Sequence, residues 1–119
     1  MRTHKIKKYT QISFVISALL VGCAAPPTLY QWEGYQPLVY EHFKGQGNTP
    51  EVQLGKLEQD LEKIRAKDNT PPPGFHAHLG LLYSQIGKID QTVQQFQTEK
   101  KLYPESAPYM DLLLKKIVK

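Results

Sequence analysis

Apolar residues recur at helical spacing through the middle of the chain. Between residues 51 and 67 they stand three or four positions apart: Leu54, Leu57, Leu61 and Ile64. This spacing places them on one stripe of a helix and the intervening charged residues on the other face. Thr49 and Pro50 precede the run as a cap and a first-turn proline, and the segment 68–74 ends it. The pattern predicts one amphipathic helix over 51–67.

The same spacing predicts one shorter helix before this segment and three helices after it. The first covers residues 36–44. The later three run from Phe75 to a glycine cap at Gly87, from residue 89 to just before Pro104, and over 107–119. No segment alternates with the period of two that a half-buried strand shows. We therefore expect an all-α fold, a small helical bundle.

Residues 73–106 resemble one tetratricopeptide unit, a helix pair of 34 residues. The resemblance rests on the apolar, glycine and proline positions of the repeat signature: Leu79, Gly80, Tyr83, Gly87, Phe96 and Pro104. In such a unit, Gly80 lets the two helices approach closely. The resemblance implies one tetratricopeptide-like helix pair, with residues 107–119 as the capping helix.

Three positions depart from the repeat. His76 stands where the repeat has tryptophan, and Thr92 and Glu99 stand where it usually has alanine. These larger side chains put close packing of the second helix in doubt, so the unit is a degenerate one. Repeat arrays also need about three units for stability. This single unit therefore has to be completed by the helix over 51–67, by the aromatic N-terminal segment, or by a partner.

The N-terminal 25 residues have the layout of an export signal. Basic residues lie between positions 2 and 8, and an apolar stretch of eleven residues covers 12–22. Crossing a bilayer takes about twenty apolar residues, so this stretch is too short for a permanent span and has the length of a signal-peptide core. We expect residues 1–22 to be removed. Ordinary secretory cleavage near Cys23 and an uncleaved N-terminal anchor are the alternatives.

The motif Leu20–Cys23 resembles the bacterial lipobox. The resemblance implies cleavage between Gly22 and Cys23, a diacylglycerol group on the Cys23 thiol, and an N-acyl chain on the new N-terminus. Two or three acyl chains anchor a protein stably, because each buried methylene contributes ~0.8 kcal/mol. Positions 24–25 are alanines and lack the aspartate that retains lipoproteins in the inner membrane of enteric bacteria. The motif thus implies the outer membrane, with the protein facing the periplasm.

The chain divides into a signal (1–22), a lipidated tether with an aromatic segment (23–35), and a helical domain (36–119). The formal charge of +4 comes from the signal, because four of the fifteen basic residues lie there and none of the eleven acids does. The remaining chain is neutral and has no basic stripe, which argues against nucleic-acid binding. A single cysteine excludes an internal disulfide.

Candidate catalytic or metal chemistry is sparse in this sequence. His76 and His78 stand two positions apart, so on a helix their side chains point about 200° apart and cannot bind one metal ion together. No Ser-His-Asp arrangement, phosphate-binding glycine loop or carboxylate pair can be identified. We expect no metal, no cofactor beyond the covalent lipid and no enzyme activity, and we interpret both histidines as structural.

Five aromatic residues gather between positions 30 and 43: Tyr30, Trp32, Tyr35, Tyr40 and Phe43. They can lie over the helical core and supply apolar area that so small a domain lacks. Alternatively some of them, Trp32 and Tyr35 among the candidates, anchor a protein interface, because tryptophan and tyrosine are favoured at binding hot spots. The sequence leaves both alternatives open.

The chain from Cys23 onward resembles a family of short bacterial lipoproteins known as domain of unknown function 4810. The resemblance rests on four runs: Leu29–Tyr35, Pro37–Tyr40, Pro72–Tyr83 and Tyr103–Pro108. It implies a cell-envelope lipoprotein without an assigned activity. Genes of such a family lie near one for a lipoprotein similar to the curli secretion channel, which implies a role in envelope assembly or secretion and makes that lipoprotein a candidate partner.

These observations predict an outer-membrane lipoprotein whose helical module serves protein–protein interaction in envelope assembly or secretion. Tetratricopeptide units bind through their concave face, so Ala77, Leu81 and Ser84 are further candidate contacts. A structural accessory subunit of a curli-channel-like secretion complex and an activator of a cell-wall enzyme are the alternative functions.

Overall fold

The computed structural model describes residues 27–45 and 47–117 of the chain. Helices cover most of this part: α2 (Tyr35–Lys44), α3 (Pro50–Ala66), α4 (Phe75–Gln85), α5 (Ile89–Leu102), the 3-10 turn η1 (Pro104–Ser106) and α6 (Ala107–Ile117). The described residues contain no strand. The predicted all-α class is confirmed, and the helices begin and end close to the predicted positions.

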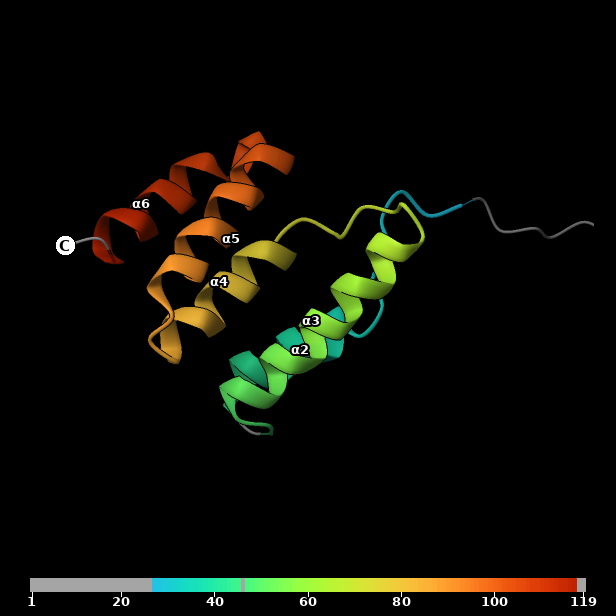
Figure 1. Ribbon diagram of the computed structural model, residues 1–119, viewed down its shortest axis with the longest axis horizontal. Helices are drawn as coiled ribbons and strands as arrows, with labels where there is room; N and C mark the ends of the chain where they lie inside the picture. Colours follow the sequence, from blue (N-terminus) through green and yellow to red (C-terminus); the bar gives the residue numbers. More distant parts are fainter. Residues whose placement is uncertain (1–26, 46, 118–119) are drawn as a thin grey trace, which may run out of the picture.

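Each helix packs against the next one along the chain. Figure 1 shows α4, α5 and α6 side by side at one end, with α3 and α2 on the other side of α4. The turn between α4 and α5 is closed by Gly87, whose φ is 75°. The N–H groups of Gly87 and Lys88 donate to the carbonyls of Ser84 (3.2 Å) and Tyr83 (2.9 Å). This is a Schellman ending, and it confirms Gly87 as the predicted cap.

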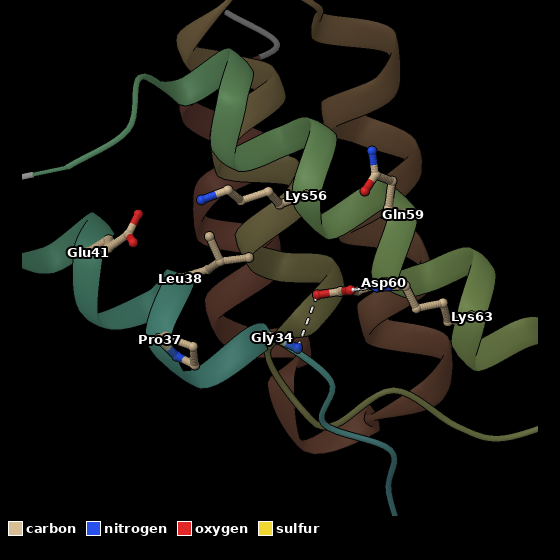
Figure 2. Close-up of a pocket in the computed structure, with 8 residues that line it drawn as sticks. All are labelled: Gly34, Pro37, Leu38, Glu41, Lys56, Gln59, Asp60 and Lys63. Atoms are coloured by element: carbon tan, nitrogen blue, oxygen red, sulfur yellow. Dashed lines mark hydrogen bonds and ion pairs between the residues drawn. The ribbon is translucent and has the colours of Figure 1, made fainter.

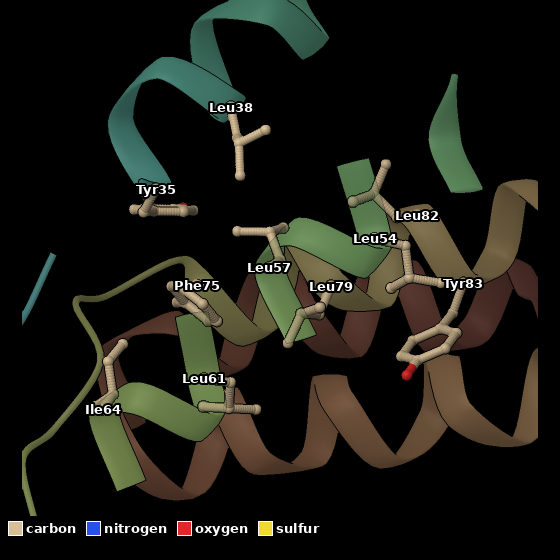
Figure 3. Packing of buried hydrophobic residues seen from close by; sticks show 10 residues of the cluster. All are labelled: Tyr35, Leu38, Leu54, Leu57, Leu61, Ile64, Phe75, Leu79, Leu82 and Tyr83. Carbon is tan, nitrogen blue, oxygen red and sulfur yellow. The ribbon is translucent and has the colours of Figure 1, made fainter. Parts of the chain in front are cut away.

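The apolar core lies between α2, α3 and α4 (Figure 3). Its ten buried members come from these three helices: Tyr35, Leu38, Leu54, Leu57, Leu61, Ile64, Phe75, Leu79, Leu82 and Tyr83. Full burial of a leucine or phenylalanine side chain contributes about 1.5–3 kcal/mol. The stripe predicted on residues 51–67 therefore faces α4, and α5 adds no side chain to this cluster.

The segment before α2 is tied to the end of α3 and to the loop that follows it. The Gln31 N–H donates to the Thr70 carbonyl at 3.0 Å. The Gly34 N–H donates to the Asp60 carboxylate, also at 3.0 Å. Together with the core contacts, these bonds hold α3 and the N-terminal segment against the α4 side of the α4–α5 pair.

No helix in the described ranges combines the length and the apolar character needed to cross a bilayer. The predicted signal over 1–22 and the acylation position Cys23 lie outside the described residues. Cleavage and lipid attachment therefore stay predictions of the sequence.

Candidate interaction site

Glu99, near the end of α5, organises the packing of α5 on α4. Its side chain is 1% exposed. Its two carboxylate oxygens accept hydrogen bonds from the N–H groups of Gly74 (2.7 Å) and Ala77 (3.3 Å), at the start of α4. Unpaired N–H groups and a partial positive charge make a helix N-terminus a fitting place for a carboxylate. Glu99 therefore supplies, from the neighbouring helix, the cap that Gly74 cannot provide.

The sequence put close packing of the second helix in doubt, and the buried positions of Thr92 and Glu99 show that α5 packs closely on α4. Thr92 and Glu99 are both fully buried, and the Thr92 hydroxyl donates to the Lys88 carbonyl at 3.0 Å. The two larger side chains satisfy polar groups inside the pair, so they do not separate the helices. Gly80 keeps the helices close, because an added Cβ would lie 2.5 Å from the Phe96 ring. This contact agrees with the close approach expected at Gly80.

A groove of about 610 Å³ crosses α3, α4 and α5, and we call it the three-helix groove. Its lining residues come from all three helices: Gly55, Glu58, Gln59, Leu61, Glu62, Arg65, Leu79, Tyr83, Gln94 and Gln95. Leu61 and Leu79 are buried, whereas Glu58, Gln59 and Gln94 are exposed. The groove thus has an apolar floor and a rim of amide and charged side chains.

Two side chains of this groove are held in place by partners. The Tyr83 hydroxyl donates to the Glu58 carboxylate, and burial together with this acceptor raises the pKa of Tyr83 to about 12. Gln95 Oε1 lies 2.6 Å from Nδ1 of the buried His76, whose pKa is lowered by burial. Groups fixed before binding lose less entropy when a ligand arrives.

A second cavity, of about 310 Å³, lies between α2 and α3 (Figure 2). Its lining includes two carboxylates, of Glu41 and Asp60, and two amines, of Lys56 and Lys63. Asp60 already accepts hydrogen bonds from the Gly34 N–H (3.0 Å) and the Lys63 ammonium (2.7 Å). Asp60 is therefore committed to contacts within the chain, and this cavity has about half the volume of the three-helix groove.

The comparison with protein families identifies one match, over residues 29–113, to Domain of unknown function (DUF4810). The chain belongs to this family. No curated protein and no solved structure matches it. The DUF4810 range includes every residue that lines either cavity, and it ends within α6.

The predicted contacts on α4 lie outside both cavities of this DUF4810 domain. Ala77, Leu81 and Ser84 are half-buried, and a turn of 100° per residue places them on one stripe of the helix. The Ser84 hydroxyl is turned onto its own helix, where it donates to the Leu81 carbonyl at 2.7 Å. None of the three lines the three-helix groove or the α2–α3 cavity. Their role in binding a partner stays a prediction.

Two rings of the predicted aromatic cluster pack against other rings of the helical domain. Tyr35 belongs to the core, with its ring centroid 5.1 Å from that of Phe75. Burial, with a smaller effect of Glu99, raises the pKa of Tyr35 to about 12. Tyr30 packs edge-on against Tyr103, with 5.9 Å between the centroids. Of the two alternatives drawn from the sequence, packing over the helical core is therefore the one that Tyr30 and Tyr35 follow.

The other three rings of the cluster face solvent. Tyr40 is 63% exposed and Phe43 80% exposed. Trp32 is 40% exposed and stacks on Tyr35, with 6.3 Å between the ring centroids. These side chains are available for a contact outside the helical core.

The two histidines of α4 diverge, as predicted. His76 bonds to Gln95 on α5, whereas the His78 ring lies 4.8 Å from that of His42 on α2. His78 is buried, and neither of its ring nitrogens has a hydrogen-bond partner among the described residues. Burial, and secondly His42, lowers the pKa of His78 to about 4. No group of three potential metal ligands occurs in the described part of the chain.

Three organising side chains were not predicted from the sequence: Glu99, Asp60 and Gln95. The sequence did single out Glu99, because the tetratricopeptide resemblance expects alanine at this position, three residues after Phe96. Asp60 and Gln95 lie among other polar residues, and nothing in the sequence distinguished them. Their roles depend on which helices meet.

Proposed function

We propose that this protein is a lipoprotein anchored in the outer membrane through acylated Cys23, and that it serves as a small protein–protein interaction module facing the periplasm. Its role would lie in cell-envelope assembly or secretion. The observation that supports this proposal best is the three-helix groove, which joins an apolar floor to a hydrogen-bonding rim over three helices.

The chemistry of the groove suits an extended peptide segment of a partner. The amides of Gln59 and Gln94 can each donate to and accept from a peptide backbone. Glu58 and Glu62 outnumber Arg65, which lies 3.3 Å from Glu62. A partner segment with a basic residue is therefore favoured over an acidic one.

The closed core favours an adaptor over an obligate subunit of a larger complex. Leucines of α3 and rings of α2 and α4 share one buried cluster, so these three helices bury apolar side chains against one another. An accessory subunit that depends on its complex would be unstable alone. Circular dichroism of the acylated protein in detergent separates the two, because a cooperative helical melt without partners is expected only for the adaptor.

Photocrosslinking in living cells tests the groove itself. We expect a photoreactive residue at Gln94 to form a discrete adduct with one envelope protein, and the same residue at Lys116, exposed on α6, to form none. Charge reversal by Glu62→Lys, whose partner Arg65 is exposed as well, should remove the adduct and leave the helical melt intact. An adduct that survives charge reversal, or one that forms equally from Lys116, would contradict the proposal.

A further inference from the structure

Apolar side chains are exposed along the segment that leads from the proposed lipid anchor into the helical domain. Leu29 is 80% exposed, and Trp32, Tyr40 and Phe43 follow it at 40%, 63% and 80%. We propose that these four side chains, which we call the aromatic edge, lie in the headgroup region of the membrane that holds acylated Cys23. The inference rests on the lipid anchor of the proposed function.

The two sides of α2 differ in a way that fits a helix lying on a surface. Tyr35 and Leu38 point into the core (Figure 3). A turn of about 100° per residue places Tyr40 and Phe43 about 140° and 80° around the helix from Tyr35, on the outer side. Lys44 borders this side and donates to the Tyr40 hydroxyl at 3.0 Å. Aromatic rings bordered by a cation are typical of helices at the membrane–water interface.

The charges on α2 are compatible with a phospholipid surface. The single acid of the helix is Glu41, and its carboxylate accepts a hydrogen bond from the Asn48 amide at 2.9 Å, on the side toward α3. The outer side of α2 therefore presents Lys44 and no carboxylate. Phosphate groups of a bilayer attract such a side and do not repel it.

The length of the tether favours lipid over a protein as the occupant of the aromatic edge. The six residues from position 24 to Leu29 reach at most about 20 Å when fully extended. The ten residues of α2 add about 15 Å. The edge is thereby confined beside the bilayer, where the effective concentration of lipid is high and weak apolar contacts suffice. A protein partner would have to displace a surface that is always present.

The side-chain types of the aromatic edge also suit the headgroup layer, which a domain on this short tether can reach. Tryptophan and tyrosine combine an apolar ring with one polar group, so they favour the boundary between acyl chains and water. Trp32 is held at this position by stacking on the buried Tyr35. Its ring can enter the headgroup layer without unfolding the segment.

Trp32 is the one tryptophan of the chain and can report its own depth. The test uses the full acylated protein in vesicles of phosphatidylethanolamine and phosphatidylglycerol whose acyl chains carry bromine. We expect the bromine to quench Trp32 emission roughly twofold relative to the same vesicles without it. The double variant Tyr40→Ser and Phe43→Ser should lose this quenching and keep its helix content.

A matched control removes two exposed apolar residues from the other end of the molecule. Tyr109 and Leu112 on α6 are 58% and 48% exposed, and Tyr109→Ser with Leu112→Ser should leave the quenching unchanged. Unquenched Trp32 in a protein whose Cys23 carries acyl chains by mass spectrometry would overturn the docking and leave the anchor standing. An unmodified Cys23 thiol would overturn both. Quenching that survives the substitutions on α2 would overturn the assignment of this face.

Discussion

The two faces of α4 are held by different kinds of contact. Toward α2 and α3 the helix presents large apolar side chains such as Phe75 and Leu79, which are buried in the core cluster. Toward α5 it presents Gly80 and His76, and the contact depends on close approach and on hydrogen bonds. The first face gains its stability from buried area, which is non-directional, and the second from geometry.

This difference decides where unpaired polar groups are tolerated. On the α5 side, Glu99, Thr92 and His76 are buried and each has a partner. Toward α2 and α3, three buried atoms have no hydrogen-bond partner among the described residues. They are the two ring nitrogens of His78 and Oε1 of Gln53. An unpaired buried group costs about 1–3 kcal/mol, which a large apolar cluster can offset. On the α5 side the buried polar groups have partners, and they lie beside the fully buried ring of Phe96.

The largest expected effect comes from filling the space at Gly80. Because a Cβ there would lie 2.5 Å from the buried ring of Phe96, Gly80→Val should lower the free energy of unfolding by about 3 kcal/mol. At Gly55 on α3 nothing lies within 4 Å of an added Cβ, so Gly55→Ala should raise it by about 0.5–1 kcal/mol. Urea denaturation measures both. Equal effects at the two glycines would contradict the close α4–α5 contact.

Removal of the cap that Glu99 supplies to α4 should have the second-largest effect on the free energy of unfolding. Glu99→Ala leaves the Gly74 and Ala77 N–H groups without their acceptor and opens a cavity, so we expect a loss of about 2.5 kcal/mol in the free energy of unfolding. Glu99→Gln keeps one acceptor oxygen and should lose less. Glu105→Ala, at an exposed position, serves as the control and should change little. A Glu99→Ala variant as stable as this control would refute the cap.

Low pH should destabilise the packing of α4 against α2, because His78 there becomes protonated. The pKa of His78 is about 4 in the folded protein against an ordinary 6.5, so its neutral form is the one that the fold favours. This contribution is complete above pH 6.5 and is lost as the pH falls toward 4, with about 2 kcal/mol gone at pH 5. His78→Leu should remove most of this slope, leaving the part due to His76, whose pKa is also lowered. Thermal melts of both proteins from pH 7.5 to 4.5 give the comparison, and parallel slopes would contradict it.

The smallest effect concerns the segment that Asp60 ties to α3. Asp60→Ala removes the acceptor of the Gly34 N–H and of the Lys63 ammonium, and should cost about 1 kcal/mol. Because the change is local, hydrogen exchange should accelerate at Gly34 far more than at the amides of α4. Uniform acceleration would show that the N-terminal segment and the core open as one unit.

The sequence predicted the helices and several of their contacts because their signals are local. Spacings of three and four placed Leu54, Leu57, Leu61 and Ile64 on one stripe, and a turn residue such as Gly87 marks a helix end whatever lies nearby. The need for glycine at Gly80 also followed from the repeat spacing. Each of these inferences requires only the geometry of a single helix or of one helix pair.

Tertiary structure alone decided how the polar and aromatic residues are used. Tyr35 is buried and Tyr40 exposed, although both are tyrosines of one short helix, because only one side of α2 meets α3 and α4. Glu99 became a cap because the start of α4 lies against it. Periodicity determines which residues share a face. Which partner that face meets, and whether a buried carboxylate finds free N–H groups there, depends on contacts between segments distant in the sequence.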